Sequence, residues 1–351
     1  MAKQNLYRMF GLAAMAVSIV HAAPSAVTCA SCHRTEAQSQ PATAMGVGIE
    51  LPGDQEPLIK HPKLNFDKNG YHYTIERQNG LSQYTVSDAN GKLTLPIKYA
   101  FGFYNLTFVL EYQGAFYESL VTYYQDVEGL GITMGDDRIR PHNLVEAMGR
   151  KTSEGEITAC FSCHGSGGVT NGKLTLDKLR PGVSCEHCHT GAAAHMEAIS
   201  AGKEAPLPRK LGDMRAEETS NFCGECHRTW EAVVGQAIFG EKNVRFQPYR
   251  LANSKCFLGN DTRIRCTACH NPHADIVRQD AAYDHACLEC HAGKSGSLPV
   301  AAAAAPTQKA CPVADKNCVS CHMAKVPVPG TPAVFHDHDI RVVRAGEPYP
   351  N

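Results

Sequence analysis

The sequence predicts a fold of mostly short α-helices and loops, with an antiparallel β-rich insertion near the N-terminus. Two observations carry this prediction. Most of the 16 cysteines in the 351 residues recur in one short unit, and each unit is expected to fit about one helical turn. The first two units are separated by a long stretch without cysteine, in which short alternating apolar runs are divided by turn dipeptides.

Residues 1–22 are expected to be a cleaved secretory signal peptide. Lys3 and Arg8 precede an apolar run from Met9 to Val20, and Val20 and Ala22 supply the residues before a cleavage point. The alternative, an uncleaved anchor, is disfavoured because a membrane span needs roughly 18 or more apolar residues. The mature chain is therefore predicted to be periplasmic or extracellular and to have no membrane span.

The formal net charge is −1 at pH 7 and the sequence shows no basic cluster. A near-neutral chain of this kind lacks the electrostatic footprint of a nucleic-acid-binding protein. Nucleic acid is therefore excluded as a partner.

Seven C-x-x-C-H units account for all but two of the cysteines. Two thiols can form thioethers with the haem vinyl groups, and the adjacent imidazole can bind the iron from one side. Zinc sites and disulfides do not require a histidine after every cysteine pair, so seven covalently bound c-type haems are predicted. In chain order the units are unit 1 (Cys29, Cys32, His33), unit 2 (Cys160, Cys163, His164), unit 3 (Cys185, Cys188, His189), unit 4 (Cys223, Cys226, His227), unit 5 (Cys266, Cys269, His270), unit 6 (Cys287, Cys290, His291) and unit 7 (Cys318, Cys321, His322).

A low-spin haem needs a second axial ligand, called distal here, which is usually His or Met. His195 and His273 follow the attachment histidines of units 3 and 5 too closely to reach across their own haems. Each is therefore predicted to ligate a neighbouring haem. His187 and His285 lie within or just before a unit and are disfavoured as ligands. Nine histidines outside the units and the signal peptide are close in number to the seven irons: His61, His72, His142, His187, His195, His273, His285, His336 and His338.

Residues 64–135 are predicted to form the β-rich region without haem. Tight turns are expected at Asn79-Gly80, Asn90-Gly91 and Gln113-Gly114. The segment 64–125 holds 14 of the chain's 26 aromatic residues. We favour a hydrophobic core for these side chains, and the alternative is a docking face for a redox partner or a second copy of the chain.

The units and linkers predict the remaining organisation. Residues 23–63 form a first haem segment, 136–293 a five-haem body, and 294–351 a linker, the seventh haem and a tail that supplies a distal ligand. Pro-, Ala- and Gly-rich connections are expected at 199–212 and 294–310. Cys256 and Cys311 fall outside the units and are expected to form a disulfide in an oxidising compartment.

Six segments of the chain form a recognisable set: GVSCEHCHTGAAAH, FCGECHRTWE, VRFQPYRLANSKCF, CTACHNPH, CVSCHMAKVPVPG and HDHDIRV. They resemble multihaem cytochromes c related to the nitrifier tetrahaem cytochrome and the hydroxylamine-oxidoreductase group. The resemblance implies distal ligands at His195, His273 and His338. It also implies a donor after unit 1, for which Met45 and His61 are both candidates, while His142 is a further candidate for the remaining irons.

Three functions remain open at this point. The favoured one is electron conduction between redox partners, such as other cytochromes and a quinol-oxidising complex. The second is an oxidoreductase acting on a small nitrogen or sulfur compound at one open haem. It is disfavoured because the sequence contains no C-x-x-C-K unit and no recognisable cross-linking tyrosine of the related enzymes. The third is a subunit of a haem filament, in which the β-rich region or a terminal ligand joins copies of the chain.

Overall fold

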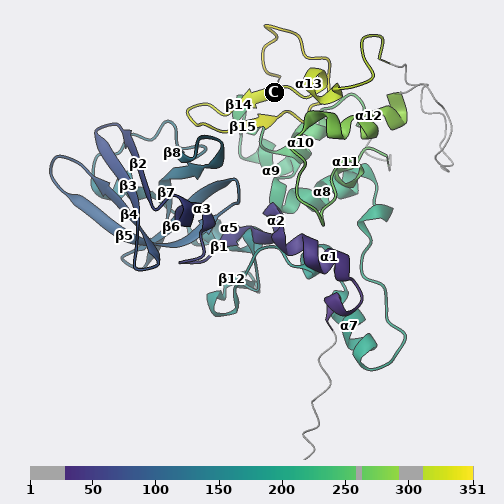
Figure 1. Cartoon of the computed structure of the whole chain (residues 1–351), viewed down its shortest axis with the longest axis horizontal. Coiled ribbons are helices and arrows are strands. Elements are labelled where there is room, and N and C mark those ends of the chain that lie inside the picture. The colour runs from purple at the N-terminus through teal and green to yellow at the C-terminus, as the bar shows by residue number, and fades with distance from the viewer. Residues whose placement is uncertain (1–27, 258–262, 292–310, 351) are drawn as a thin grey trace, which may run out of the picture.

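The computed structural model describes residues 28–257, 263–291 and 311–350. A curled sheet occupies one side of the molecule, and most of the helices that carry C-x-x-C-H units occupy the other side (Figure 1). The predicted signal peptide (1–22) and the predicted linker 294–310 lie outside the described residues. Within the described part of the chain, no helix has the length and apolar character needed to cross a membrane.

The largest element is an antiparallel sheet of nine strands. Strands β2 to β8 are paired in chain order, while β1 pairs with β5 and β9 pairs with β7. Two of its strands, β1 and β9, lie outside the interval 64–135. The strands are β1 (Ile49–Glu50), β2 (Lys63–Lys68), β3 (Tyr71–Gln78), β4 (Leu81–Ser87), β5 (Lys92–Phe101), β6 (Asn105–Tyr112), β7 (Ala115–Tyr124), β8 (Gly129–Ile132) and β9 (Gly149–Lys151).

Two hairpin turns show why the sequence folds into a meander here. Asn79 and Gly80, between β3 and β4, have φ angles of 52° and 81°, and Gln113 and Gly114, between β6 and β7, have φ angles of 50° and 74°. Two consecutive residues with positive φ form the turn whose twist matches that of the flanking strands. Both turns lie where the sequence predicts them.

The concave side of the sheet encloses a core of its own. Tyr73, Tyr84 and Phe108 are at most 1% exposed and project from three different strands into this core. The Tyr84 hydroxyl donates a hydrogen bond to the backbone oxygen of Met148 at 3.0 Å, so its polar atom is satisfied in the apolar interior. Leu58 joins the same core. Most of the aromatic residues of this region therefore serve as core, which is the favoured of the two interpretations.

The predicted fold class, mostly short α-helices and loops around stacked haems, is wrong. Helix accounts for 36% and strand for 24% of the described residues, and the main sheet is nearly closed on itself. The physical reason is that the aromatic-rich segment buries enough apolar surface to form a core without any haem. The strands β1 and β9 then extend this sheet into the flanking segments.

The helices are short and mostly follow the sheet in the chain. Three of the longest, α5, α8 and α12, each end in a C-x-x-C-H unit. The α-helices are α1 (Arg34–Ser39), α2 (Ala44–Val47), α3 (Glu56–Lys60), α4 (Leu144–Met148), α5 (Glu154–His164), α6 (Cys185–Cys188), α7 (Ala192–Ser200), α8 (Ala216–His227), α9 (Trp230–Gly235), α10 (Gln247–Ala252), α11 (Cys266–Cys269), α12 (Asp284–His291) and α13 (Cys318–His322).

Shorter elements connect these helices. The 3₁₀ turns are η1 (Cys29–Ser31), η2 (Gln40–Ala42), η3 (Gln125–Val127), η4 (Leu176–Lys178), η5 (Leu211–Asp213), η6 (Gly240–Asn243) and η7 (Asp280–Tyr283). Three two-stranded ladders pair β10 (Gly165–Ser166) with β13 (Arg180–Pro181), β11 (Val169–Thr170) with β12 (Lys173–Leu174), and β14 (Lys325–Pro327) with β15 (Val334–His336).

A second aromatic cluster joins the outside of the sheet to α5. Phe161, which lies between the two cysteines of unit 2, is fully buried. Its ring meets those of Tyr99 and Phe101 edge-on, at centroid distances of 4.9 Å and 5.2 Å. Edge-to-face aromatic pairs of this kind are favourable beyond their burial. The sheet therefore supports the helix that carries unit 2.

Glu50, in β1, is expected to make the stability of the fold depend on pH. Burial, followed by the charges of Glu56 and Asp54, raises the pKa of Glu50 to about 7. A raised carboxyl pKa contributes stability that is full below the unfolded-state value and is lost as the pH rises toward 7. Glu50→Gln should therefore stabilise the protein by about 1 kcal/mol at pH 8 and by much less at pH 4.

Urea unfolding at both pH values tests this expectation. The control is Glu36→Gln, which removes an exposed carboxylate of α1. Equal effects of Glu50→Gln at the two pH values would show that folding does not raise the pKa of Glu50.

Candidate haem centres

Each C-x-x-C-H unit lies on a helical turn. Unit 1 lies on η1, units 3, 5 and 7 lie on α6, α11 and α13, and units 2, 4 and 6 form the last turns of α5, α8 and α12. Residues three apart on a helix share one side, so both thiols of a unit can face the same porphyrin edge. All the unit cysteines are at least partly exposed. The residues present therefore fit the covalent attachment of haem.

In several histidines the ring Nδ1 forms a hydrogen bond with a backbone carbonyl. A carbonyl can only accept, so Nδ1 carries the proton and Nε2 keeps a free lone pair, as in most metal-bound histidines. Two of them, His195 and His285, also follow or precede a unit closely. The pairs are His164 with Gly48 (2.8 Å), His189 with Arg209 (3.1 Å), His195 with Pro206 (2.9 Å), His285 with Ala282 (2.8 Å) and His338 with His336 (3.1 Å).

Two attachment histidines face histidines from other parts of the chain. The ring centroids of His189 and His273 are 5.9 Å apart with an interplanar angle of 9°. Those of His270 and His338 are 6.2 Å apart with an angle of 35°. An iron bound by two imidazole nitrogens at about 2 Å each holds the ring centroids about 6 Å apart. Both pairs therefore have the spacing that two axial ligands of one haem require.

Burial keeps the imidazoles of this region neutral. Desolvation, with a smaller contribution from His270, lowers the pKa of His338 to about 4. Burial also lowers the pKa of His164, His227 and His270. Only the neutral imidazole has a lone pair for iron, so these rings are in the form that a haem would need.

The other predicted distal ligands lie in varied surroundings. The His61 ring lies 5.8 Å from that of Tyr123 of the sheet, and the backbone N–H of His142 donates to Glu146 just before α4. The carbonyl of Met45, in α2, accepts a hydrogen bond from the backbone N–H of Val183, two residues before unit 3. These positions assign no haem to any of the three residues, and their roles stay predictions.

Two spare histidines have both ring nitrogens engaged. Nδ1 and Nε2 of His72 contact Asp67 and Thr74 at 2.6 Å and 3.2 Å. Nδ1 of His336 donates to the carbonyl of Met323, and its Nε2 lies 3.2 Å from a carboxylate oxygen of Asp280. Both nitrogens of each ring already contact other protein atoms in this structure, which disfavours these two histidines as distal ligands.

Neighbouring units meet through their cysteines. The thiol of Cys163 in unit 2 contacts that of Cys226 in unit 4 and lies 3.9 Å from the backbone oxygen of Glu225. Three other sulfur pairs join units in the same way. They are Cys29 with Cys185, Cys223 with Cys266, and Cys287 with Cys318.

The expected disulfide between Cys256 and Cys311 is wrong, since both are free cysteines in the structure. Cys256 follows α10, where burial raises the pKa of its thiol, whereas Cys311 is exposed. The two thiols therefore lie in different surroundings and do not bond.

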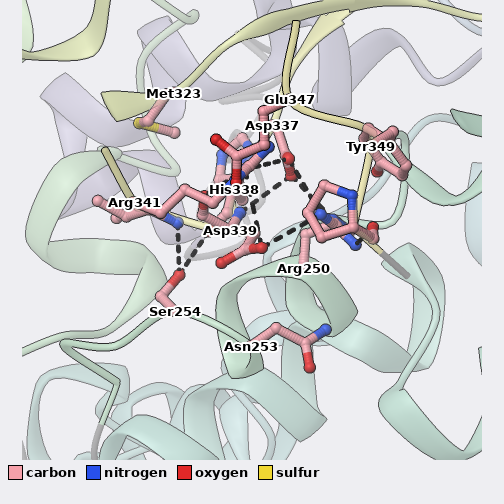
Figure 2. A network of polar contacts seen from close by, with 12 residues as sticks. Arg250, Asn253, Ser254, Met323, Asp337, His338, Asp339, Arg341, Glu347 and Tyr349 are labelled. Atoms are coloured by element: carbon pink, nitrogen blue, oxygen red, sulfur yellow. Dashed lines mark hydrogen bonds and ion pairs between the residues drawn. The ribbon is translucent and has the colours of Figure 1, made fainter. Parts of the chain in front are cut away.

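A buried charged cluster that was not predicted from the sequence lies beside His338 (Figure 2). Arg250 of α10 and Asp337 of the C-terminal tail form its centre, with side chains that are both 0% exposed. Two signals could have revealed it. Arg250 lies directly between the apolar residues Tyr249 and Leu251 of α10, and two aspartates flank one histidine in HDHDIRV.

Comparison with known proteins supports the haem assignment. A family model described as cytochrome c554 and c-prime matches residues 138–190, which contain units 2 and 3. This match supports a cytochrome c relationship, with covalently bound haem iron and a part in electron transport. No curated protein and no solved structure shows significant similarity to the chain.

Proposed function

We propose that the chain is an exported seven-haem c-type cytochrome that conducts electrons between redox partners in the periplasm or at the cell surface. The observation that carries the proposal is the contact between attachment sites: four sulfur pairs join units that are distant in sequence. Haems bound at touching cysteines have adjacent porphyrin edges, and this closeness favours electron transfer. When bound, the haem irons would supply the one-electron chemistry.

The contacts support a specific order of haems. Unit 1 meets unit 3 through Cys29 and Cys185. Unit 4 meets unit 2 through Cys226 and Cys163, and it meets unit 5 through Cys223 and Cys266. Units 6 and 7 meet through Cys287 and Cys318. Cys188 of unit 3 contributes to the raised pKa of both cysteines of unit 4. Cys269 of unit 5 contributes in the same way to the raised pKa of Cys287 in unit 6.

The proposed path therefore runs from unit 1 through units 3, 4, 5 and 6 to unit 7, with unit 2 as a branch beside the sheet. Unit 1 lies near the N-terminus of the described chain and unit 7 near its C-terminus. Electrons would enter and leave through different partners at these ends, with other cytochromes and a quinol-oxidising complex as the proposed partner classes.

His189 with His273 and His270 with His338 are the proposed axial pairs of two haems, on the strength of their ring spacing. We assign His195 and one of Met45 and His61 to other irons, as the resemblance to the nitrifier tetrahaem and hydroxylamine-oxidoreductase cytochromes implies. His142 is a further candidate for the remaining irons. Irons with two protein ligands pass electrons without binding substrate, which favours a carrier over an enzyme.

Two measurements on the purified holoprotein test the proposal. The intact mass of the mature chain should correspond to seven attached haems, and carbon monoxide added to the reduced protein should leave the haem spectrum nearly unchanged. Fewer haems would mean that a unit is unused. Binding of roughly one carbon monoxide per molecule would instead reveal an open iron and support the oxidoreductase alternative.

A further inference from the structure

We propose that Arg250 is the positioning residue that holds His338 toward His270 and thereby sets the axial ligation of the haem at Cys266 and Cys269. The inference rests on the proposed function, because it takes His338 as a distal ligand. It assigns a role to a buried charge that haem attachment does not require.

Arg250 makes its contacts with the C-terminal tail. Its Nε and Nη2 donate to the two carboxylate oxygens of Asp337 at 2.8 Å and 3.0 Å, and Nη1 donates to the backbone oxygen of Pro350 at 2.9 Å. The guanidinium carbon lies 4.6 Å from the ring centroid of Tyr349. A two-bond pairing of arginine with a carboxylate has a defined geometry as well as strength. The tail is therefore held at two separate points by one side chain.

The backbone is held on both sides of His338. Asp337 precedes this histidine and is bound by Arg250 (Figure 2). The Ser254 hydroxyl donates to the carbonyl of His338 at 2.7 Å and accepts from the N–H of Ile340 at 2.8 Å. Since the residues before and after His338 are both anchored, little freedom remains in the direction of its imidazole.

Arg341 also contacts Asp337, at 2.8 Å, but it cannot replace Arg250. Arg341 lies four residues after Asp337 on the same tail, so its bond neutralises the carboxylate without tying the tail to another element. Arg250 belongs to α10, which packs against α8. Helix α11, which carries unit 5, packs against α8 as well. Arg250 therefore links the tail to the helices that place His270.

The loss of hydration offsets much of the attraction within a buried ion pair, so such a pair is weak evidence for stability by itself. An apolar contact between α10 and the tail could supply comparable stability without orienting the chain. The pair at Arg250 is directional, and it stands directly beside the histidine that has to face His270. Positioning therefore accounts for this arrangement better than stability alone.

The test compares purified holoprotein variants by electron paramagnetic resonance, by carbon monoxide binding after reduction, and by intact mass. His338→Ala is the reference and should bind roughly one carbon monoxide per molecule. Arg250→Gln should bind about half of that amount with all haems attached, because the tail loses its anchor while His338 remains. Arg250→Lys should fall between Arg250→Gln and the unmodified protein, since an ammonium group cannot form the two-bond pairing.

Arg150→Gln is the matched control. Arg150 of β9 also bonds two carboxylates, those of Glu118 and Glu156, each at 2.7 Å. Its loss should leave carbon monoxide binding unchanged. The double variant Arg250→Gln/His338→Ala should bind no more than His338→Ala alone, because both changes act on one iron.

The outcomes separate two failures. If His338→Ala yields no high-spin haem, the ligand assignment under the proposed function is wrong. If His338→Ala gains a high-spin haem that binds carbon monoxide but Arg250→Gln remains fully low-spin, Arg250 has no positioning role. If Arg250→Gln does not accumulate, Arg250→Lys and Ser254→Ala take its place in the same two measurements. The proposal is overturned if both variants keep a fully low-spin electron paramagnetic resonance spectrum and bind no carbon monoxide.

Discussion

Replacing His273 with alanine is expected to convert the haem of unit 3, and not that of unit 5, to a high-spin centre that binds carbon monoxide. His273 follows unit 5 in the chain, but its ring stacks opposite that of His189 in unit 3 at 5.9 Å. Loss of this imidazole leaves the iron with one protein ligand, while the thioethers are untouched. Electron paramagnetic resonance and carbon monoxide titration should therefore report one altered haem among seven attached ones.

A second set of variants identifies the altered haem. Adding Cys185→Ala and Cys188→Ala to His273→Ala removes the attachment site of unit 3 and should abolish the new carbon monoxide binding. His72→Ala is the control, because both nitrogens of that ring are already engaged within the sheet. A His273→Ala variant that stays entirely low-spin would make His273 an ordinary histidine and remove one axial pair from the proposed set.

Replacing Phe161 with alanine is expected to destabilise the protein by about 3 kcal/mol, since it leaves a cavity where a fully buried ring packed. The ring meets Tyr99, Phe101 and Phe116 of the sheet at centroid distances between 4.9 Å and 6.4 Å. The loss should appear as a lower midpoint of urea unfolding, followed by far-ultraviolet circular dichroism. All haems should remain attached, because Phe161 is not one of the fixed residues of its C-x-x-C-H unit.

Ser162→Ala provides a control at the next position of the same unit, where the side-chain hydroxyl donates to the carbonyl of Ala159 and lies 3.8 Å from the sulfur of Cys163. It should shift the unfolding midpoint by far less than Phe161→Ala does. Equal effects of the two variants would mean that α5 gains little from the sheet. The aromatic cluster on the outside of the sheet would then have no supporting role for unit 2.

The sequence predicted the features whose chemistry is local. Each attachment unit spans five residues, and the structure places every one on a helical turn. The turns at Asn79-Gly80 and Gln113-Gly114 were also predictable, because the backbone preference of two adjacent residues determines them. The large share of the fold that the sheet occupies was not predictable, because closure of the sheet depends on how several distant segments share one core.

What the sequence determined by itself is therefore the set of C-x-x-C-H units and the prediction that His273 serves a haem other than its own. The tertiary structure alone decided that His273 faces His189, and that His338 faces His270. It also decided that Arg250 meets Asp337, 87 residues further along the chain. The reason is physical: covalent chemistry and turn geometry act between near neighbours, whereas the partner of a buried imidazole or guanidinium is chosen by the packing of the whole molecule.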